Sequence, residues 1–153
     1  MAADTKQFII AYLNKSQYGI DINYIDNIIV MQNITRIPKS QKFFRGVINL
    51  RGEIVPVMSL SNRLGIEEAP YTSKSRIIIV RPENGTAPVG LVVDEVKEVI
   101  TLEHDSIEKM TYDDKDEKAN YSIGIGKYNN DLVNLLNIPS IVIEKEANLN
   151  NVN

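Results

Sequence analysis

The sequence contains no cysteine, no tryptophan and only one histidine among its 153 residues. Without cysteine, disulfides and thiolate metal sites cannot form, which agrees with a reducing cytosol. No run approaches the roughly 18 apolar residues of a membrane-spanning helix. The amino terminus also lacks the apolar core of a signal peptide. We therefore expect a soluble, cytoplasmic protein without direct membrane insertion.

Reactive groups are scarce as well. His104 stands between Glu103 and Asp105, where a surface role is expected because a catalytic base needs partners. The acidic run 113–118 lacks the glycine and the roughly twelve-residue spacing of an EF-hand, which favours a solvated loop over a calcium site. The segment 124–126 is only Gly-x-Gly and does not open a helix. We expect no catalytic residue, no metal and no cofactor, and hence no enzyme.

The bulk composition is that of one globular domain, with 43% apolar residues and a net charge of −3. With this negative net charge, the chain lacks the overall basic character that is typical of nucleic-acid-binding domains. One stretch nevertheless combines cations with aromatic residues, so small-barrel nucleic-acid binding remains the alternative function. Its members are Lys39, Lys42, Phe43, Phe44, Arg45, Arg51 and Arg63.

The stretch from Phe44 to Gly65 carries the strongest local pattern. Two runs rich in β-branched residues, 47–50 and 54–58, flank Arg51-Gly52-Glu53, which predicts a tight hairpin turn. Pro56 has no N–H to donate, so the second run is expected at a sheet edge or in a locally irregular strand. Residues 60–64 predict a short helical turn that stops at Gly65.

Further apolar runs predict strands along the rest of the chain. They cover Phe8–Leu13, Tyr18–Ile22, residues around 28–30, Arg76–Arg81, Val89–Val93 and the segment with Val96, Val99 and Ile100. Residues 33–42 are expected to be irregular, and 101–110 to be extended or a short helix.

The two halves of the chain repeat each other. Residues 19–29 match 90–100 in their glycine, strand and later aliphatic positions. Gly46-Val47 matches Gly124-Ile125, and the aliphatic positions of 54–60 match those of 132–138. Each unit is too small for a deep core of its own, so the two are expected to bury their apolar faces against one another.

This pattern predicts an all-β fold of two five-stranded small barrels with short helical turns, packed on a shared core. The predicted domain covers residues 7–143, with a first subdomain at about 14–66 and a second at about 74–143. Residues 1–6 and 144–153 are expected to be flexible termini.

The sequence resembles the CheW family of bacterial chemotaxis coupling proteins. The resemblance rests on Thr35-Arg36-Ile37-Pro38, on the run from Phe44 to Val57 with its Asn-Leu-Arg-Gly turn, and on 18–22 and 89–94. It spans about residues 7 to 143. It implies SH3-like barrels and a non-catalytic adaptor located at membrane-associated chemoreceptor arrays. The implied partners are the regulatory domain of a CheA-type histidine kinase and the cytoplasmic tip of a chemoreceptor, with ring assembly through kinase or other CheW copies.

Site residues follow from the same resemblance. The implied receptor-binding positions are Ile25, Asn27, Gly46, Arg51, Ile77 and Val99. The implied kinase-binding positions are Ile34, Thr35 and Ile37.

Several of these positions also have a purely structural interpretation. Ile25, Ile77 and Val99 could be core residues, Arg51 could bond neighbouring carbonyls, and Gly46 could serve backbone geometry alone.

Three positions depart from the family pattern. Asn27 replaces a frequent acidic residue, which leaves any charge pair there open. Gln41 replaces a proline, and Ser59 replaces an aspartate at the start of the helical turn, although serine also caps helices.

Overall fold

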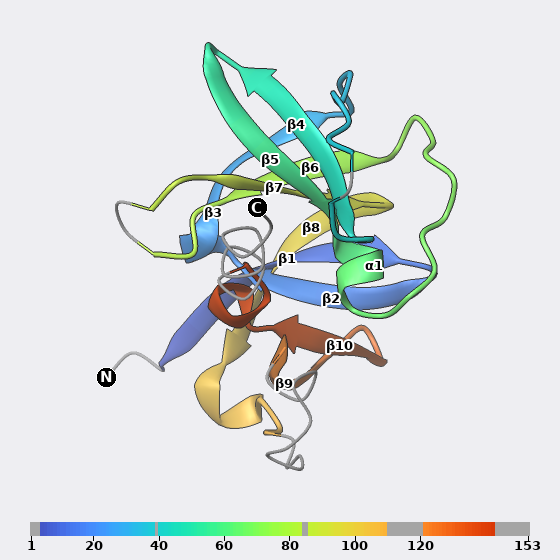
Figure 1. Cartoon of the computed structure of the whole chain (residues 1–153). Coiled ribbons are helices and arrows are strands. Elements are labelled where there is room, and N and C mark those ends of the chain that lie inside the picture. Colours follow the sequence, from blue (N-terminus) through green and yellow to red (C-terminus); the bar gives the residue numbers. More distant parts are fainter. Residues whose placement is uncertain (1–3, 39, 84–85, 110–120, 143–153) are drawn as a thin grey trace.

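The computed structural model describes residues 4–38, 40–83, 86–109 and 121–142. These residues form two five-stranded sheets, and the all-β prediction is confirmed (Figure 1). One sheet has the strand order β8-β1-β2-β10-β9, and the other has the order β3-β6-β7-β5-β4. The predicted acidic loop 113–118 and the predicted tail 144–153 lie outside the described residues.

The first sheet combines the beginning and the end of the chain. Its strands are β1 (Thr5–Leu13), β2 (Ser16–Asp21), β8 (Glu95–Glu103), β9 (Ser122–Tyr128) and β10 (Asp131–Leu136). The second sheet uses the middle, with β3 (Ile25–Val30), β4 (Phe44–Leu50), β5 (Glu53–Ser59), β6 (Arg76–Val80) and β7 (Val89–Val93). The short helices are η1 (Ile22–Tyr24), α1 (Leu60–Arg63), η2 (His104–Ser106) and the helical residues 138–142.

The predicted halves do not coincide with the sheets. β2 belongs to the first predicted half but pairs in parallel with β10, and β7 belongs to the second half but pairs in parallel with β5. β6 also crosses over, because it pairs with β3. Each sheet is therefore completed by strands from the opposite half. The sequence pattern identified the repeat correctly, but a boundary between 66 and 74 does not separate the two sheets.

Each sheet curls around a small core of its own. In the second sheet, Ile29 of β3 and Ile48 of β4 come from opposite ends and pack in one cluster with Val57 and Ile77. In the first sheet, Ile100 of β8 packs with Val133 of β10, and Ile123 of β9 closes the same cluster. Side chains from both ends of a sheet meet only if the sheet is strongly coiled.

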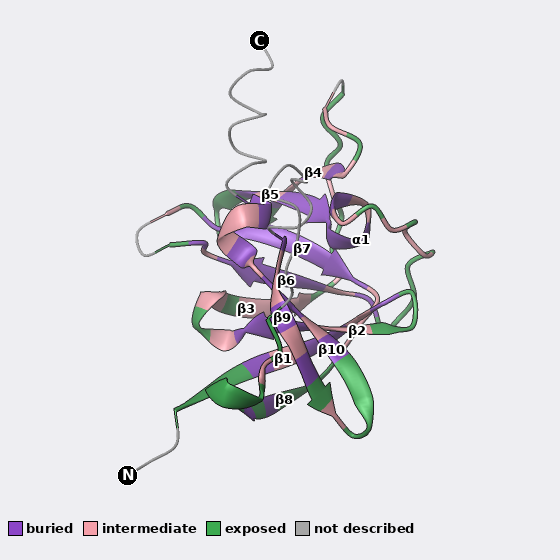
Figure 2. Ribbon diagram, turned by 90° about the horizontal axis from the view of Figure 1, so that it is seen from below, coloured by how far each residue is buried: buried purple, intermediate pink, exposed green. Residues whose placement is uncertain are grey.

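A third and larger core lies between the sheets. Alternate residues of β1 and β6 point to opposite sides, as strand geometry requires. On β6, Ile77 and Ile79 enter the core of their own sheet, whereas Ile78 and Val80 enter the shared core. On β1, Phe8 and Ile10 enter the core of the first sheet, whereas Ala11 and Leu13 enter the shared core. β6 and the second half of β1 thus contribute to cores on both faces, which explains the apolar runs there (Figure 2).

The hairpin turns agree with the sequence. Arg51 and Gly52 have φ angles of 54° and 86°, and Asn129 and Asn130 have 51° and 65°. Positive φ at both central residues is what the two-residue hairpin turn with right-handed strand twist requires. Asn14 and Lys15, between β1 and β2, share this conformation, with φ angles of 50° and 72°.

Pro56 does not mark a sheet edge, because β5 lies between β4 and β7. Its partner on β4 is Val47, whose N–H and C=O both bond to Thr35 instead of β5. Val47 and Pro56 are therefore a non-hydrogen-bonded pair, and the proline nitrogen faces β7. Parallel pairing with β7 begins only at Val57. The strand accommodates proline because no ladder bond is needed at that position.

The predicted helical turn is α1, and Gly65 follows it with a φ of 80°. Ser59 caps it by accepting a hydrogen bond from the Asn62 amide at 3.2 Å. Serine therefore does the capping at this departure from the family pattern. At the amino terminus, Thr5 and Lys6 pair with β8, so residues 5 and 6 are part of the sheet and not of a flexible terminus.

The exchange of strands makes a direct prediction about fragments. A fragment of residues 14–66 lacks β6 and β7, so β3 loses its antiparallel partner and β5 its parallel partner. We expect it to remain unfolded when produced alone, since isolated hairpins are marginal in water. Amide chemical-shift dispersion and a denaturation curve measure this. A cooperative unfolding transition in the fragment would contradict the topology.

Candidate functional site

Seven of the nine sequence-predicted positions fall on three separate parts of the molecule. We call Ile25, Asn27 and Val99 the β3–β8 surface, and Ile34, Thr35 and Ile37 the Thr35 surface. The third part is the tip of the β4–β5 hairpin with Arg51, which projects from the body of the fold in Figure 1.

The β3–β8 surface consists of positions on two edge strands that both contribute to the shared core. β3 is an edge of one sheet, and β8 is an edge of the other. Ile25 and Val96 pack from these two strands onto the shared core. Val99 is 48% exposed, and a large exposed aliphatic side chain on an edge strand is available for contact.

Asn27 occupies the pairing irregularity between β3 and β6, and its side-chain oxygen accepts a hydrogen bond from the Ile28 amide at 2.9 Å. It therefore stabilises the local backbone. The nearby ion pair joins Asp26 Oδ2 and Arg81 Nε at 3.7 Å.

Ile77 does not belong to this surface. Its side chain has no exposed area and packs in the core of the second sheet. A methyl group of Ile77 lies 2.8 Å from the place where a Cβ on Gly90 would stand, so it fills the space that this glycine leaves open. The core interpretation of Ile77 is therefore the one the geometry supports, and we remove it from the docking residues.

Gly46 is buried and acts through the backbone. Its φ angle is 135°, and a Cβ there would lie 2.1 Å from the carbonyl oxygen of Thr35. Next to it, the Val47 N–H donates to Thr35 O at 2.9 Å, and the Thr35 N–H donates to Val47 O at 2.8 Å. Only glycine allows this close approach. Gly46 is thus what allows the Thr35 surface to lie against β4.

The second half contains the same device. Gly124 has a φ angle of 152°, and a Cβ there would lie 2.7 Å from the carbonyl oxygen of Glu108. Ile125 and Glu108 exchange backbone hydrogen bonds of 2.8 and 2.9 Å. The repeat therefore extends from the strands to the segments that flank them.

The Thr35 surface presents one well-exposed apolar side chain. Ile37 is 44% exposed, whereas Ile34 packs partly against the core of the second sheet. Ile37 borders a hollow that is also lined by three cationic side chains, and its full lining is Arg36, Ile37, Pro38, Ser40, Gln41, Lys42, Phe44 and Arg45. An apolar side chain within a polar rim is the usual composition of a protein contact.

Arg45 is held firmly at one side of this hollow. Its Nη2 lies 2.9 Å from Glu68 Oε1, and its Nη1 donates to the carbonyl oxygen of Lys42 at 2.9 Å. Desolvation lowers the pKa of Arg45, but the hydrogen bond and attraction to Glu68 outweigh it and raise the pKa overall. Tyr71 donates to Glu68 at 3.2 Å, and burial raises the pKa of Tyr71. This network fixes residues 68–71 to the start of β4.

Arg51 is exposed at the hairpin tip, and its guanidinium makes no hydrogen bond or ion pair with the described residues. The turn beneath it is closed by the Gly52 amide, which donates to Asn49 Oδ1 at 2.8 Å. The turn is therefore stabilised without the arginine side chain. Ile54, on the same hairpin, is 63% exposed.

The five cations and two phenylalanines that suggested nucleic-acid binding do not form one face. Arg63 is buried, Arg45 pairs with Glu68, and Arg51 lies at the hairpin tip. Phe44 is 8% exposed, so one of the two phenylalanines is a buried residue. Lys39 lies outside the described residues.

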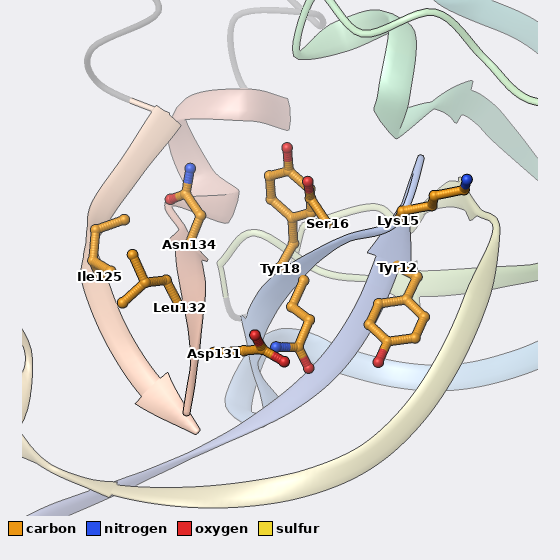
Figure 3. A pocket seen from close by; sticks show the side chains of 9 residues that line it. Tyr12, Lys15, Ser16, Tyr18, Ile125, Asp131, Leu132 and Asn134 are labelled. Carbon is orange, nitrogen blue, oxygen red and sulfur yellow. The ribbon is translucent and has the colours of Figure 1, made fainter. Parts of the chain in front are cut away.

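A further hollow of about 410 Å³ lies on the first sheet. Its lining comes from β1, β2, β9, β10 and the first turn, and comprises Tyr12, Lys15, Ser16, Gln17, Tyr18, Ile125, Asp131, Leu132 and Asn134. Figure 3 shows Lys15 extending away from the other side chains. Within the described ranges, no group of three or more His, Asp or Glu residues could hold a metal ion.

Sequence reasoning did not identify Arg63 as a buried residue. It grouped this arginine with surface cations, although the equivalent position in the second copy of the repeat is the apolar Ile141. A cation at a position that is aliphatic in the other copy was the available signal. Sequence alone did not show that two aromatic rings meet there.

Comparisons with known proteins agree with this architecture. A family model described as the CheW-like domain matches residues 7–146. The chain belongs to the CheW-like family. The chemotaxis protein CheW of Bacillus subtilis is 33% identical over 151 residues, covering 96% of this chain and 94% of that protein. CheW of Thermotoga maritima is 34% identical and covers 86% of this chain and 84% of its own length.

A solved structure extends the likeness to three dimensions. The scaffolding protein TtCheW from Thermoanaerobacter tengcongensis superimposes with a TM-score of 0.80 at 33% identity, covering 92% of this chain and 89% of that one. The CheW-like assignment thus rests on sequence and fold together. None of the helices in the described part of the chain is long and apolar enough to cross a membrane.

Replacement of Gly46 tests how this CheW-like chain holds the Thr35 surface. Gly46→Ala places a methyl group against Thr35 O at a positive φ, so we expect a stability loss of about 2–5 kcal/mol. The amides of Thr35 and Val47 should also lose protection from hydrogen exchange. Chemical denaturation and exchange measured by NMR give both quantities.

Gly52→Ala is the matched control. It also introduces alanine at a positive φ, 86°, but no atom lies within 4 Å of the new methyl group. We expect a loss of only about 1–2 kcal/mol, with the Thr35 amide still protected. Equal losses in the two variants would show that the contact with Thr35 is not what requires glycine.

Proposed function

We propose that this CheW-like chain is a non-catalytic adaptor that couples chemoreceptors to a CheA-type histidine kinase within chemotaxis arrays. The carrying observation is that its accessible apolar side chains lie on separate surfaces of one continuously packed body. Val99 lies on β8, whose Val96 packs on the shared core, and Ile37 follows Thr35, which is hydrogen-bonded to Val47 of β4. Two partners can therefore be held at once.

The receptor tip is assigned to the β3–β8 surface and to the hairpin tip. Ile25 and Val99 offer aliphatic contact on two edge strands, and Arg51 offers an exposed planar donor. Arginine with its side chain free at a turn is well suited to bind a carboxylate or carbonyl group of a partner. Asn27 supports this region by stabilising β3.

The regulatory domain of the kinase is assigned to the Thr35 surface. Ile37 supplies the exposed apolar contact, Ile34 packs against the core of the second sheet, and Thr35 is anchored to β4 through Val47. Arg36 and Lys42 beside Ile37 favour a partner surface that carries acidic groups around an apolar centre.

The adaptor acts without bond making or breaking. Each contact is small, so its affinity is modest, and joining many of them in an array supplies avidity. Ring assembly with kinase domains or with further CheW-like copies follows the same principle. A change in receptor state shifts the chain between two packings of the same surfaces. The size of this shift is set by the difference between the receptor's affinities for the two packings. The site of action is the cytoplasmic side of the receptor array.

Nucleic-acid binding, the alternative function, gains no support from the arrangement of cations. Of its five cations, one is buried and one is paired with a carboxylate. Such binding would fall steeply with salt, because counterions are released from the phosphates. A retardation assay at two salt concentrations distinguishes it from adaptor function.

Substitution of Arg51 tests the receptor assignment. We expect Arg51→Ala to leave the protein folded and to weaken binding of a receptor tip by about tenfold, which corresponds to ~1.4 kcal/mol. Circular dichroism and a binding titration measure the two effects. Lys15→Ala is the matched control, because Lys15 is also an exposed cation at positive φ in a hairpin turn. A folded Arg51→Ala variant with wild-type receptor affinity would rule out the contact role.

Substitution of Ile37 tests the kinase assignment. Ile37→Asp places a charge on the exposed apolar centre of the Thr35 surface, so we expect kinase-domain affinity to fall at least about tenfold. Ile34 is less suitable, since it packs partly against the core. Ile54→Asp, at a still more exposed position on the hairpin, is the control for calorimetry. Unchanged affinity of Ile37→Asp would place the kinase surface elsewhere.

A further inference from the structure

A buried arginine lies at the junction of the two halves. Arg63 is the last residue of α1 and is 9% exposed. Its Nε donates to the carbonyl oxygen of Ile141, in the helical residues after β10, at 3.1 Å. A charged side chain is rarely buried unless its partners compensate for the lost hydration.

Two aromatic rings surround the same guanidinium. The Arg63 Cζ atom lies 4.7 Å from the ring centre of Phe43 and 5.0 Å from that of Tyr121. Both distances are within the range of cation–π attraction, which is strongest where water is excluded. Arg63 therefore contacts one ring from each half of the chain.

The two rings occupy the same place in the repeat. The Phe43 carbonyl accepts a hydrogen bond from the Ser59 amide at 2.7 Å, and the Tyr121 carbonyl accepts one from the Asn137 amide at 2.8 Å. Ser59 and Asn137 each precede a short helix and cap it through their side chains. Phe43 and Tyr121 thus begin equivalent segments, which lead into β4 and β9.

We propose that Arg63 is the positioning residue that fixes these two entry segments against each other, and that it thereby holds the Thr35 surface in place relative to the second half. The last part of this inference rests on the proposed function, because it treats the Thr35 surface as a kinase-binding surface.

Short contacts connect Arg63 to that surface. Phe43 precedes Phe44, whose amide donates to Gln41 O at 3.0 Å, and Arg45 Nη1 donates to Lys42 O at 2.9 Å. Gln41 and Lys42 line the hollow beside Ile37. A shift of the Phe43 ring is therefore passed to the rim of the Thr35 surface. Phe43 also packs on the shared core, together with Ile25 of the β3–β8 surface.

The chemistry of the site calls for arginine. A planar guanidinium can lie near two rings and still donate from Nε in its own plane, whereas a lysine ammonium is a compact, strongly hydrated charge without that fork. An aliphatic residue, as at the equivalent Ile141, fills space but bonds no carbonyl. Arg63→Met and Arg63→Lys therefore remove different parts of the interaction.

Hydrogen exchange in the free, full-length chain tests the positioning role. In Arg63→Met we expect the Ser59 and Asn137 amides to lose about tenfold more protection than the amides of β7, because the junction opens locally. Arg63→Lys should show the same pattern to a smaller extent. A uniform loss at all three places would mean that Arg63 contributes only to global stability, and a loss at Ser59 or Asn137 alone would mean that it does not join the halves. Either result overturns the proposal.

Leu64→Ala is the matched control for lowered stability. Leu64 follows Arg63 and packs on the shared core, but it takes no part in the contacts with the two rings. We expect it to reduce protection evenly across Ser59, Asn137 and β7. A selective loss in this variant would show that any weakening of the core opens the junction, and would also contradict the proposal.

Kinase binding tests the functional part. We expect Arg63→Met to weaken binding of a CheA-type regulatory domain by at least about fivefold, and Leu64→Ala to leave it unchanged at a temperature where both are folded. Wild-type affinity in Arg63→Met would overturn the link to the Thr35 surface. If the wild-type chain itself did not bind the kinase domain, the proposed function would fail, while the exchange result would still decide the positioning role.

Discussion

The parallel pairing of β5 with β7, and of β10 with β2, is the constraint on which the fold depends. Each pair joins strands from opposite halves of the chain. Both include a glycine opposite an aliphatic residue, Gly90 opposite Val57 and Gly19 opposite Leu135. A Cβ at Gly90 would lie 2.8 Å from Ile77, and one at Gly19 would lie 2.6 Å from Leu135. The small cores close only because these positions carry no side chain.

A repeated backbone with different side chains yields a molecule with unlike surfaces. Pro56 and Asn134 are equivalent in the repeat, as are Arg63 and Ile141. Backbone features recur in both halves: Gly46 leaves room for Thr35, and Gly124 leaves room for Glu108. The side chains that face outward do not. Such a doubled scaffold can present separate contacts to different partners while its cores keep them in a fixed relation.

Much of this fold follows from local patterns in the sequence. The apolar runs identified the strands, the positive-φ turn at Arg51-Gly52 was evident from glycine, and the matched positions of the two halves revealed the repeat. These features depend on residues close in sequence, where hydrophobic periodicity and turn chemistry act directly. The shared core also followed, because each unit has more apolar surface than it can bury alone.

The errors arise where distant segments meet. Nothing near β6 or β7 in sequence shows that they pair with strands of the first half, since local pattern does not specify a partner strand. Ile77 was assigned to the receptor-binding surface through the family resemblance, and strand alternation could not correct this because both faces of β6 are buried. Arg63 was counted among surface cations, because its burial depends on the rings of Phe43 and Tyr121. The edge assignment of Pro56 failed because the Thr35 segment, not a strand partner, takes the hydrogen bonds of Val47.

The central claim is that one chain holds kinase and receptor at the same time on separate surfaces. Sedimentation velocity of the chain mixed with a kinase regulatory domain and a receptor tip tests it most directly. The account predicts a ternary complex that contains all three components, with neither partner displacing the other. Displacement of one partner by the other, or sedimentation of the chain alone in the presence of both, would contradict it.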